Sequence, residues 1–181
     1  RVNEKMETPV NGYYCIGDAN GRCLLAHAAS AQGMVAVENA LGHERIYDAA
    51  IPYCVYTFPE IASVGLSQEQ AHAKGLPVAV GAFPLTHLGK ALAVGETEGF
   101  VKVLRHRGTG AVLGVHMLGH NATECIAAAA ALLGRRASTR ELAETVFAHP
   151  TMSESIKEAA EDALGEGLHL PPRKVVRVAA P

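Results

Sequence analysis

Two β-type runs joined by a glycine-containing loop place the strongest constraint on how this chain folds. Residues 100–104 and 111–118 are rich in branched apolar side chains, and Arg107-Gly108-Thr109-Gly110 lies between them. Glycines suit the positive φ angles of tight loops, so the pattern predicts an antiparallel hairpin. The loop superficially resembles a nucleotide-binding fingerprint, but its spacing is wrong and it joins two strands instead of a strand and a helix.

Further strands and capped helices surround this hairpin. Residues 53–58 and 78–83 are strand-like. Three Ser/Asn-x-x-Glu/Gln patterns are typical of helix N-termini, and a fourth helix is expected over 153–164. Ser67 would cap a short helix, and Asn121 an almost wholly apolar helix through Leu133. Ser138 would cap a helix to about Phe147. Strands followed by helices indicate an α+β fold, an antiparallel β-sheet with helices on one face.

The first fifty residues have a different pattern. Residues 13–16 are predicted to form a strand, 17–21 a loop, and 24–40 an Ala-rich helix interrupted by Gly33. Ile51-Pro52 marks a boundary, because the residue before a proline is held out of the helical region. We therefore expect one region over 1–50, a domain over 51–173 and an extended tail over 174–181.

Composition excludes several classes of function. The net charge of −2 and the scattered basic residues argue against a nucleic-acid partner. The longest apolar run, 126–133, is far shorter than the roughly 20 residues that cross a bilayer. His87, His106, His116 and His120 have no partner at metal-ligand spacing, so no metal site is expected. The four cysteines lack CxxC or CxxxxC spacing, which indicates reduced thiols in a cytoplasmic protein.

The segment Ala148-His149-Pro150-Thr151-Met152-Ser153-Glu154 is the main candidate for chemistry. Pro150 keeps His149 in non-helical backbone, five residues before a carboxylate that opens a helix. A carboxylate on one ring nitrogen fixes the tautomer and leaves the other nitrogen to exchange protons. The alternative is structural: Thr151-x-x-Glu154 is also a capping box, with Thr151 as the N-cap.

A second candidate lies near the N-terminus. Gly17 lets a ligand approach the backbone, and Asp18 could accept hydrogen bonds from the hydroxyls of a sugar or ribityl chain. Leu25, Ala26 and His27 lie in the first turn of the next helix, whose amides favour negative charge. Asp18 could equally make a simple Asx-turn, and His27 could be an ordinary histidine.

Taken together, several segments resemble the C-terminal part of the pyridine nucleotide-disulphide oxidoreductases, most closely the dihydrolipoamide dehydrogenases among them. The resemblance covers almost the whole chain in unbroken order, and residues 155–160 after the histidine segment strengthen it. The matching segments are 14–18, 25–27, 56–65, 95–102, 113–116 and 148–154.

The resemblance implies a function and a role for each candidate residue. Such enzymes are homodimers that oxidise the dihydrolipoamide of a lipoyl-bearing acyltransferase in a 2-oxo acid dehydrogenase complex, using FAD and NAD. His149 would be the acid/base of the opposite subunit's active site, oriented by Glu154, with Pro150 near that subunit's flavin. Asp18 would bind the ribityl chain of FAD, and the segment Leu25, Ala26 and His27 would lie near the pyrimidine ring of the flavin.

The resemblance also implies what the chain lacks. The family's GxGxxG and CxxxxC motifs are absent, and the chain does not begin with methionine, so we expect a fragment in which residues 1–50 are a strand-loop-helix remnant of the FAD-binding region. Alone it should be inactive and should not hold FAD tightly. Helix 122–133 and the helix from Ser153 should form the dimer contact. A glutathione or mercuric reductase, or a non-catalytic homodimeric module, are the alternatives.

Overall fold

The structure, a computed structural model, describes residues 1–171. The chain forms two compact units, Arg1–Ile51 and a second unit that begins at Pro52. The tail predicted over 174–181 lies outside the described residues. Within the described part of the chain, no helix is both long and apolar enough to cross a membrane.

The first unit consists of loops, the 3-10 helix η1 (Gly17–Asn20) and the helix α1 (Ala26–Ala40). The strand predicted over 13–16 is wrong, because Tyr14 makes only an isolated antiparallel bridge to Glu7 before the chain enters η1. The predicted interruption at Gly33 is also wrong, because α1 continues through this residue. A single interior glycine costs only about 1 kcal/mol relative to alanine, which the good helix formers around it offset.

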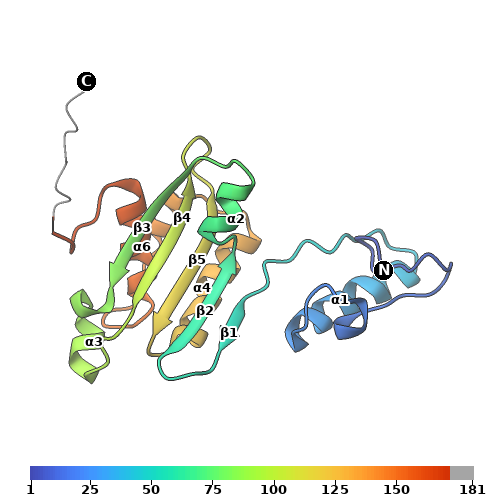
Figure 1. Cartoon of the computed structure of the whole chain (residues 1–181), viewed down its shortest axis with the longest axis horizontal. Helices are drawn as coiled ribbons and strands as arrows, with labels where there is room; N and C mark the ends of the chain where they lie inside the picture. Colours follow the sequence, from blue (N-terminus) through green and yellow to red (C-terminus); the bar gives the residue numbers. More distant parts are fainter. Residues whose placement is uncertain (172–181) are drawn as a thin grey trace. The chain divides into compact units, whose positions relative to one another are not determined.

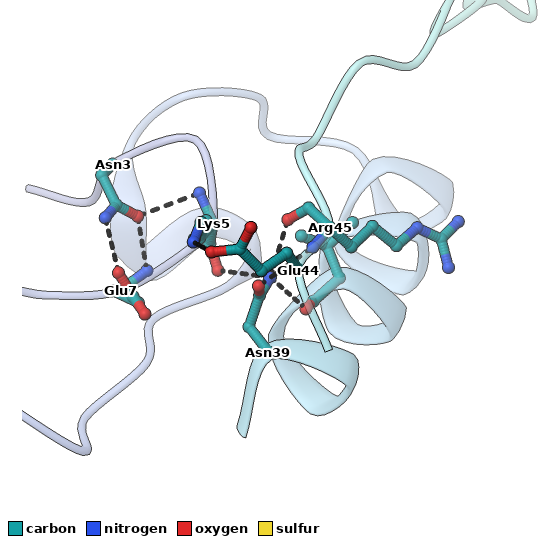
Figure 2. Close-up of polar contacts among 7 residues, drawn as sticks. Asn3, Lys5, Glu7, Asn39, Glu44 and Arg45 are labelled. Carbon is teal, nitrogen blue, oxygen red and sulfur yellow. Dashed lines mark hydrogen bonds and ion pairs between the residues drawn. The ribbon is translucent and has the colours of Figure 1, made fainter. Parts of the chain in front are cut away.

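The side chain of Asn39 ties the two ends of the first unit together (Figure 2). Its Nδ2 donates to Lys5 O at 3.4 Å, near the N-terminus, and to Val35 O and Arg45 O, each at 2.8 Å, while its Oδ1 accepts from Arg45 N at 3.1 Å. Lys5 and Glu44 add an exposed ion pair of 2.9 Å. The small core beneath them contains Met6, Val35 and Ala36, packed with Val2, Tyr14 and Tyr47.

The second unit is built on a five-stranded sheet in the order β1-β2-β5-β4-β3, and every neighbouring pair is antiparallel (Figure 1). The strands are β1 (Tyr53–Val55), β2 (Glu60–Gly65), β3 (Val78–Pro84), β4 (Phe100–His106) and β5 (Val112–Gly119). The predicted hairpin is β4 and β5, with Phe100 opposite Leu118 and a register shift at Leu104/Arg105. In its loop, Gly110 adopts a φ of +75°.

Helices α4 (Ala122–Gly134) and α6 (Glu154–Leu164) cover one face of this sheet (Figure 1), and a further helix packs beside them. Helix α4 packs on β2 and β5, α6 packs on β3 and β4, and α5 (Thr139–Glu144) packs against α6. The predicted α+β class is therefore confirmed. The core between the layers includes Val64, Val101, Val103, Val115, Met117, Ile126, Leu142 and Ile156.

Short elements occupy the remaining connections. The helix α2 (Gln68–Ala73) follows β2, while η2 (Leu85–His87) and α3 (Gly89–Val94) follow β3. Ser67 and Ser138 form the reciprocal capping boxes that the sequence predicts for α2 and α5.

The predicted Asn121 cap of α4 is wrong. Asn121 lies in the left-handed region at φ +58° and makes no side-chain cap. Glu60, from strand β2, reaches the same helix end, where its Oε2 accepts from Thr123 N at 2.9 Å and from Thr123 Oγ1 at 2.8 Å. A carboxylate at the N-terminus also suits the dipole of the helix.

The contact between α6 and the edge strand β3 is unusually close. A Cβ atom at Gly81 would lie 2.1 Å from Ala159 O and 2.2 Å from Ala163 N, so only glycine fits there. One residue further, Asp162 Oδ2 accepts a hydrogen bond from Ala82 N at 2.8 Å. The steric fit and the hydrogen bond together set how far α6 lies along the strand.

We predict that Gly81→Ala lowers the free energy of unfolding of the second unit by about 1–3 kcal/mol, because the added methyl group displaces the α6 backbone. Urea unfolding measures the change. Ala82→Val, on the exposed side of the same strand, is the control and should stay within about 0.5 kcal/mol of the parent. An unchanged stability for Gly81→Ala would contradict the close contact.

Candidate functional site

The segment before α6 presents His149 at the surface. His149 and Pro150 are exposed and lie in irregular backbone, as the proline predicts. Met152, which is only 4% exposed, anchors this segment in the core next to them. The imidazole thus projects from a short loop whose far end is fixed by burial and by the first turn of α6.

His149 and Glu154 form a hydrogen-bonded pair. The distance between His149 Nδ1 and Glu154 Oε1 is 2.8 Å, and the side chains are 77% and 20% exposed. The other carboxylate oxygen, Oε2, accepts from Thr151 N at 2.8 Å. Each oxygen therefore has its own donor, and the second bond orients the carboxylate toward the ring.

The capping prediction for Thr151 is wrong. Its Oγ1 donates to Ala148 O at 2.7 Å instead of accepting from an amide of α6. The N-cap position belongs to Ser153, which has helical backbone angles and makes no side-chain cap. Glu154 does reach back to an amide, as a capping residue would, but it uses only one oxygen to do so.

A pocket of about 160 Å³ lies beside this pair. Gly89, at the start of α3, lies next to the ring: a Cβ atom built there would be in ordinary van der Waals contact with His149 Cε1, at 4.0 Å. The lining residues are Phe83, His87, Leu88, Gly89, His149, Glu154, Glu158 and His169. The sequence reasoning included neither Glu158 nor His169, since a pair eleven residues apart matches no local motif.

The candidate cofactor residues of the first unit lie at two neighbouring helix ends. Asp18 lies in η1, where its carboxylate is exposed and the turn is closed by a backbone bond from Gly21 N to Asp18 O of 3.0 Å. Leu25 is the N-cap residue of α1 and makes no side-chain cap, while Ala26 and His27 are exposed in the first turn. The first amides of an α-helix have no acceptor within the helix itself.

The buried side chain of Gln32 holds the Asp18 turn against α1. Its Oε1 accepts from Gly17 N at 2.8 Å and from Asn20 Nδ2 at 2.7 Å. Gly17 has a φ of +64°, and a Cβ atom there would lie 3.1 Å from Ala29 Cβ. The sequence analysis missed Gln32; a polar residue on the core-facing side of a helix is the signal that could have identified it.

The described residues contain neither a disulfide nor a cluster of metal-binding side chains. All four cysteines are free, and burial raises the pKa of the Cys54 and Cys125 thiols, which keeps them protonated. No group of three or more His, Cys, Asp and Glu side chains in residues 1–171 is placed to hold a metal ion.

The second unit matches a known domain. Residues 51–160 match the dimerisation domain of the pyridine nucleotide-disulphide oxidoreductases, and the chain belongs to that family. Its relatives include dihydrolipoyl dehydrogenase of Bacillus subtilis, which is 42% identical over 170 residues, covering 93% of this chain and 36% of that protein. Dihydrolipoyl dehydrogenase of Thermus scotoductus is 43% identical, with 94% and 37% covered.

Solved structures share the fold. LpdA from Mycobacterium tuberculosis superposes with a TM-score of 0.82 at 33% identity, covering 88% of this chain and 35% of that one. The flavoprotein disulfide reductase RclA from Escherichia coli shares the fold with a TM-score of 0.80, at 23% identity and with 89% and 38% covered. This chain therefore spans little more than a third of the length of its relatives.

We predict that Glu154→Gln reverses the hydrogen bond to His149. A glutamine can still accept from Thr151 N with its oxygen, but then its amide donates to Nδ1 and moves the ring proton to Nε2. Nitrogen-15 NMR of labelled histidine distinguishes the two tautomers. Glu144→Gln, at an exposed carboxylate of α5, is the control; a ring that keeps its Nδ1 proton in the Glu154 variant would disprove the orienting role.

Proposed function

We propose that this chain is the C-terminal part of a flavoprotein that oxidises dihydrolipoamide to lipoamide with NAD as the acceptor. The observation that carries the proposal is the 2.8 Å bond between His149 Nδ1 and Glu154 Oε1, within a chain about 40% identical to dihydrolipoyl dehydrogenases. The proposed catalytic residues are thus His149 and Glu154.

The geometry of the pair suits proton transfer. With Nδ1 donating to Glu154, Nε2 carries a lone pair and can take a proton from a thiol of the substrate. The carboxylate then stabilises the imidazolium that forms, while its bond from Thr151 N prevents it from turning away. A thiol that loses its proton becomes the thiolate that disulfide exchange requires.

The first unit offers groups that fit part of FAD. The exposed Asp18 carboxylate could accept a hydrogen bond from a ribityl hydroxyl, and the amides at Leu25, Ala26 and His27 could donate to the pyrimidine ring, where the helix dipole favours negative charge. When bound, FAD supplies the two-electron acceptor. These contacts are few, so we expect that the rest of the protein supplies most of the affinity for FAD and all of that for NAD.

We further propose that the protein works as a homodimer in which His149, next to Pro150, serves the site of the opposite subunit. The dimerisation domain and the exposed position of the imidazole support this arrangement. Helix α4 presents an outer face that includes Ala127 and Ala131, both exposed, and small residues allow helices to approach closely. Helix α6 is mostly buried in its own unit, including Ser155 and Ile156 of its first turn, so we expect the exposed segment of His149 and Pro150 before it, and not the helix itself, to take part in pairing.

The partner that we propose is the lipoyl-bearing acyltransferase of a 2-oxo acid dehydrogenase complex, in the cytoplasm, where free thiols such as these stay reduced. The chain without the rest of the protein would be inactive. A glutathione- or mercury-reducing relative would share the fold and the dyad but not the substrate, and a non-catalytic module would share only the fold.

In the full-length protein, we predict that His149→Gln slows lipoamide turnover by about 10²–10⁴-fold, because the proton acceptor is lost. Flavin absorbance should stay that of the parent, since the substitution lies outside the proposed FAD contacts. His72→Gln, at an exposed histidine of α2, is the control and should leave turnover unchanged. Unchanged turnover in the His149 variant would remove this residue from the mechanism.

We predict that Ala131→Glu weakens the homodimer, because the change places a charge on the proposed pairing face of α4. Analytical ultracentrifugation of the full-length protein at micromolar concentration should show a shift toward monomer. Ala73→Glu makes the same change at an exposed alanine of α2 and should leave the dimer intact. A variant at 131 that stays fully dimeric would exclude this face of α4.

A further inference from the structure

The side chain of Gln32 joins both ends of the short helix that carries Asp18. Asp18 is the second residue of η1, the 3-10 helix over Gly17–Asn20. Gln32 comes from α1, is fully buried, and accepts two hydrogen bonds at its Oε1 atom. The donors are Gly17 N at 2.8 Å and Asn20 Nδ2 at 2.7 Å. One oxygen atom thus binds the first and the last residue of the turn.

Asn20 passes this constraint on to the chain on either side of η1. Its Nδ2 also donates to Cys15 O at 3.2 Å, and its Oδ1 accepts from Arg22 N at 2.9 Å. The Asn20 amide group therefore has partners at both its nitrogen and its oxygen. Because Gln32 is one of these partners, the segments that enter and leave η1 depend on the same buried oxygen.

Close packing restrains the turn from the other direction. Gly17 has a φ of +64°, and a Cβ atom there would lie 3.1 Å from Ala29 Cβ on α1, closer than ordinary van der Waals contact. The backbone of η1 therefore has little room to move toward α1, while the hydrogen bonds to Gln32 keep it from moving away. The exposed carboxylate of Asp18 takes its position from this restrained backbone.

The two ends of the Gln32 amide are used unequally. Its Nε2 is buried and has no hydrogen-bond partner among the described residues, and the same holds for Tyr47 Oη. Tyr47 lies near, since burial raises the pKa of its hydroxyl and the Gln32 side chain opposes part of this rise. The turn thus requires an acceptor at position 32 but no donor. A carboxylate there would keep the acceptor, and its second oxygen could accept from Tyr47 Oη.

We propose that Gln32 is a positioning residue for FAD, which acts by holding Asp18 where its carboxylate meets the ribityl chain. The inference rests on the proposed function, in which Asp18 accepts a hydrogen bond from a ribityl hydroxyl. Such a bond spans about 2.5–3.0 Å and weakens steeply when the groups are misaligned, so a small shift of η1 is enough to lose it.

The test measures FAD binding to the flavin-free full-length protein by equilibrium dialysis. Asp18→Ala should weaken binding by about 10–100-fold, the size of one hydrogen bond to a charged group. Gln32→Met keeps the length of the side chain but removes the acceptor, and should weaken binding by about tenfold because Asp18 is then misplaced. Gln32→Glu restores the acceptor and should bind FAD within about threefold of the parent.

A double-mutant cycle shows whether Gln32 acts through Asp18. Once Asp18→Ala has removed the carboxylate, the addition of Gln32→Met should weaken binding by no more than about twofold, because no carboxylate is left to position. An equal loss in both backgrounds would overturn the inference, since Gln32 would then support the unit in general.

Val35→Ala is the control for destabilisation that does not reach η1. Val35 is 3% exposed in the same helix and packs with Met6 in the small core of the first unit. This variant should unfold more easily in urea than the parent but bind FAD within about threefold of it. If it binds FAD as weakly as Gln32→Met does, the effect of Gln32 is only structural.

Asn20→Ala provides a second test should Gln32→Met fail to fold. Asn20 is half-buried, and the change removes its donor to Gln32 while the Gln32 side chain stays in place. This variant should also weaken FAD binding by about tenfold, and a parent-like affinity would contradict the inference.

The outcomes distinguish this inference from the proposed function. If Asp18→Ala weakens FAD binding and Gln32→Met does not, the inference alone fails. If Asp18→Ala leaves FAD binding unchanged, the proposed contact between Asp18 and FAD is wrong, and the role of Gln32 falls with it. The turnover of the His149 variant tests the acid/base proposal separately from both.

Discussion

The placement of helix α6 on the edge strand β3 is the constraint on which the candidate site depends. Gly81 lets the helix backbone come as close as the strand allows, and Asp162 fixes the position along the strand through Ala82 N. Because a helix is stiff, this contact near its C-terminal half also determines where its first turn lies. Glu154 and Glu158 follow one turn apart, and both carboxylates are thereby aimed at one pocket. A site built on a rigid element is held more accurately than one built on loops alone.

The sequence predicted those parts of the fold whose causes are local. The β4-β5 hairpin follows from two β-type runs around a glycine loop, and the boxes at Ser67 and Ser138 need only residues three apart. The cap predicted at Asn121 failed because a distant group supplied the bond. Glu60, in strand β2, accepts the hydrogen bond from the N-terminus of α4, so Asn121 does not act as the cap that its local pattern predicts. A hydrogen bond from a residue far away in the sequence produces no periodic pattern that could predict it.

In the candidate site, too, the locally determined features were predictable and the long-range ones were not. His149 and Glu154 could be paired from their spacing, since the proline between them restricts the loop and the helix start fixes the carboxylate. The pair of Glu158 and His169 could not, because it depends on how the segment after α6 turns back. In the first unit, the sequence pointed to Asp18 but not to Gln32, fourteen residues later, whose single oxygen holds the turn in place. Side chains that carry chemistry resemble motifs, while those that position them are recognised mainly by burial.

The unequal exposure of the first pair has a mechanistic consequence. Glu154 is largely covered, whereas three quarters of the His149 side chain faces outward. In bulk water, the interaction between two such charges is weak, and water competes for the reacting nitrogen. The pair gains strength as an acid/base group when a second surface covers the imidazole and lowers the local dielectric constant. Such a cover is what a neighbouring subunit would provide, so the exposed ring and the dimerisation domain both support the proposed sharing of the active site between subunits. On this view the chain contributes an oriented proton acceptor, and the surface that makes it effective belongs to the opposite protomer.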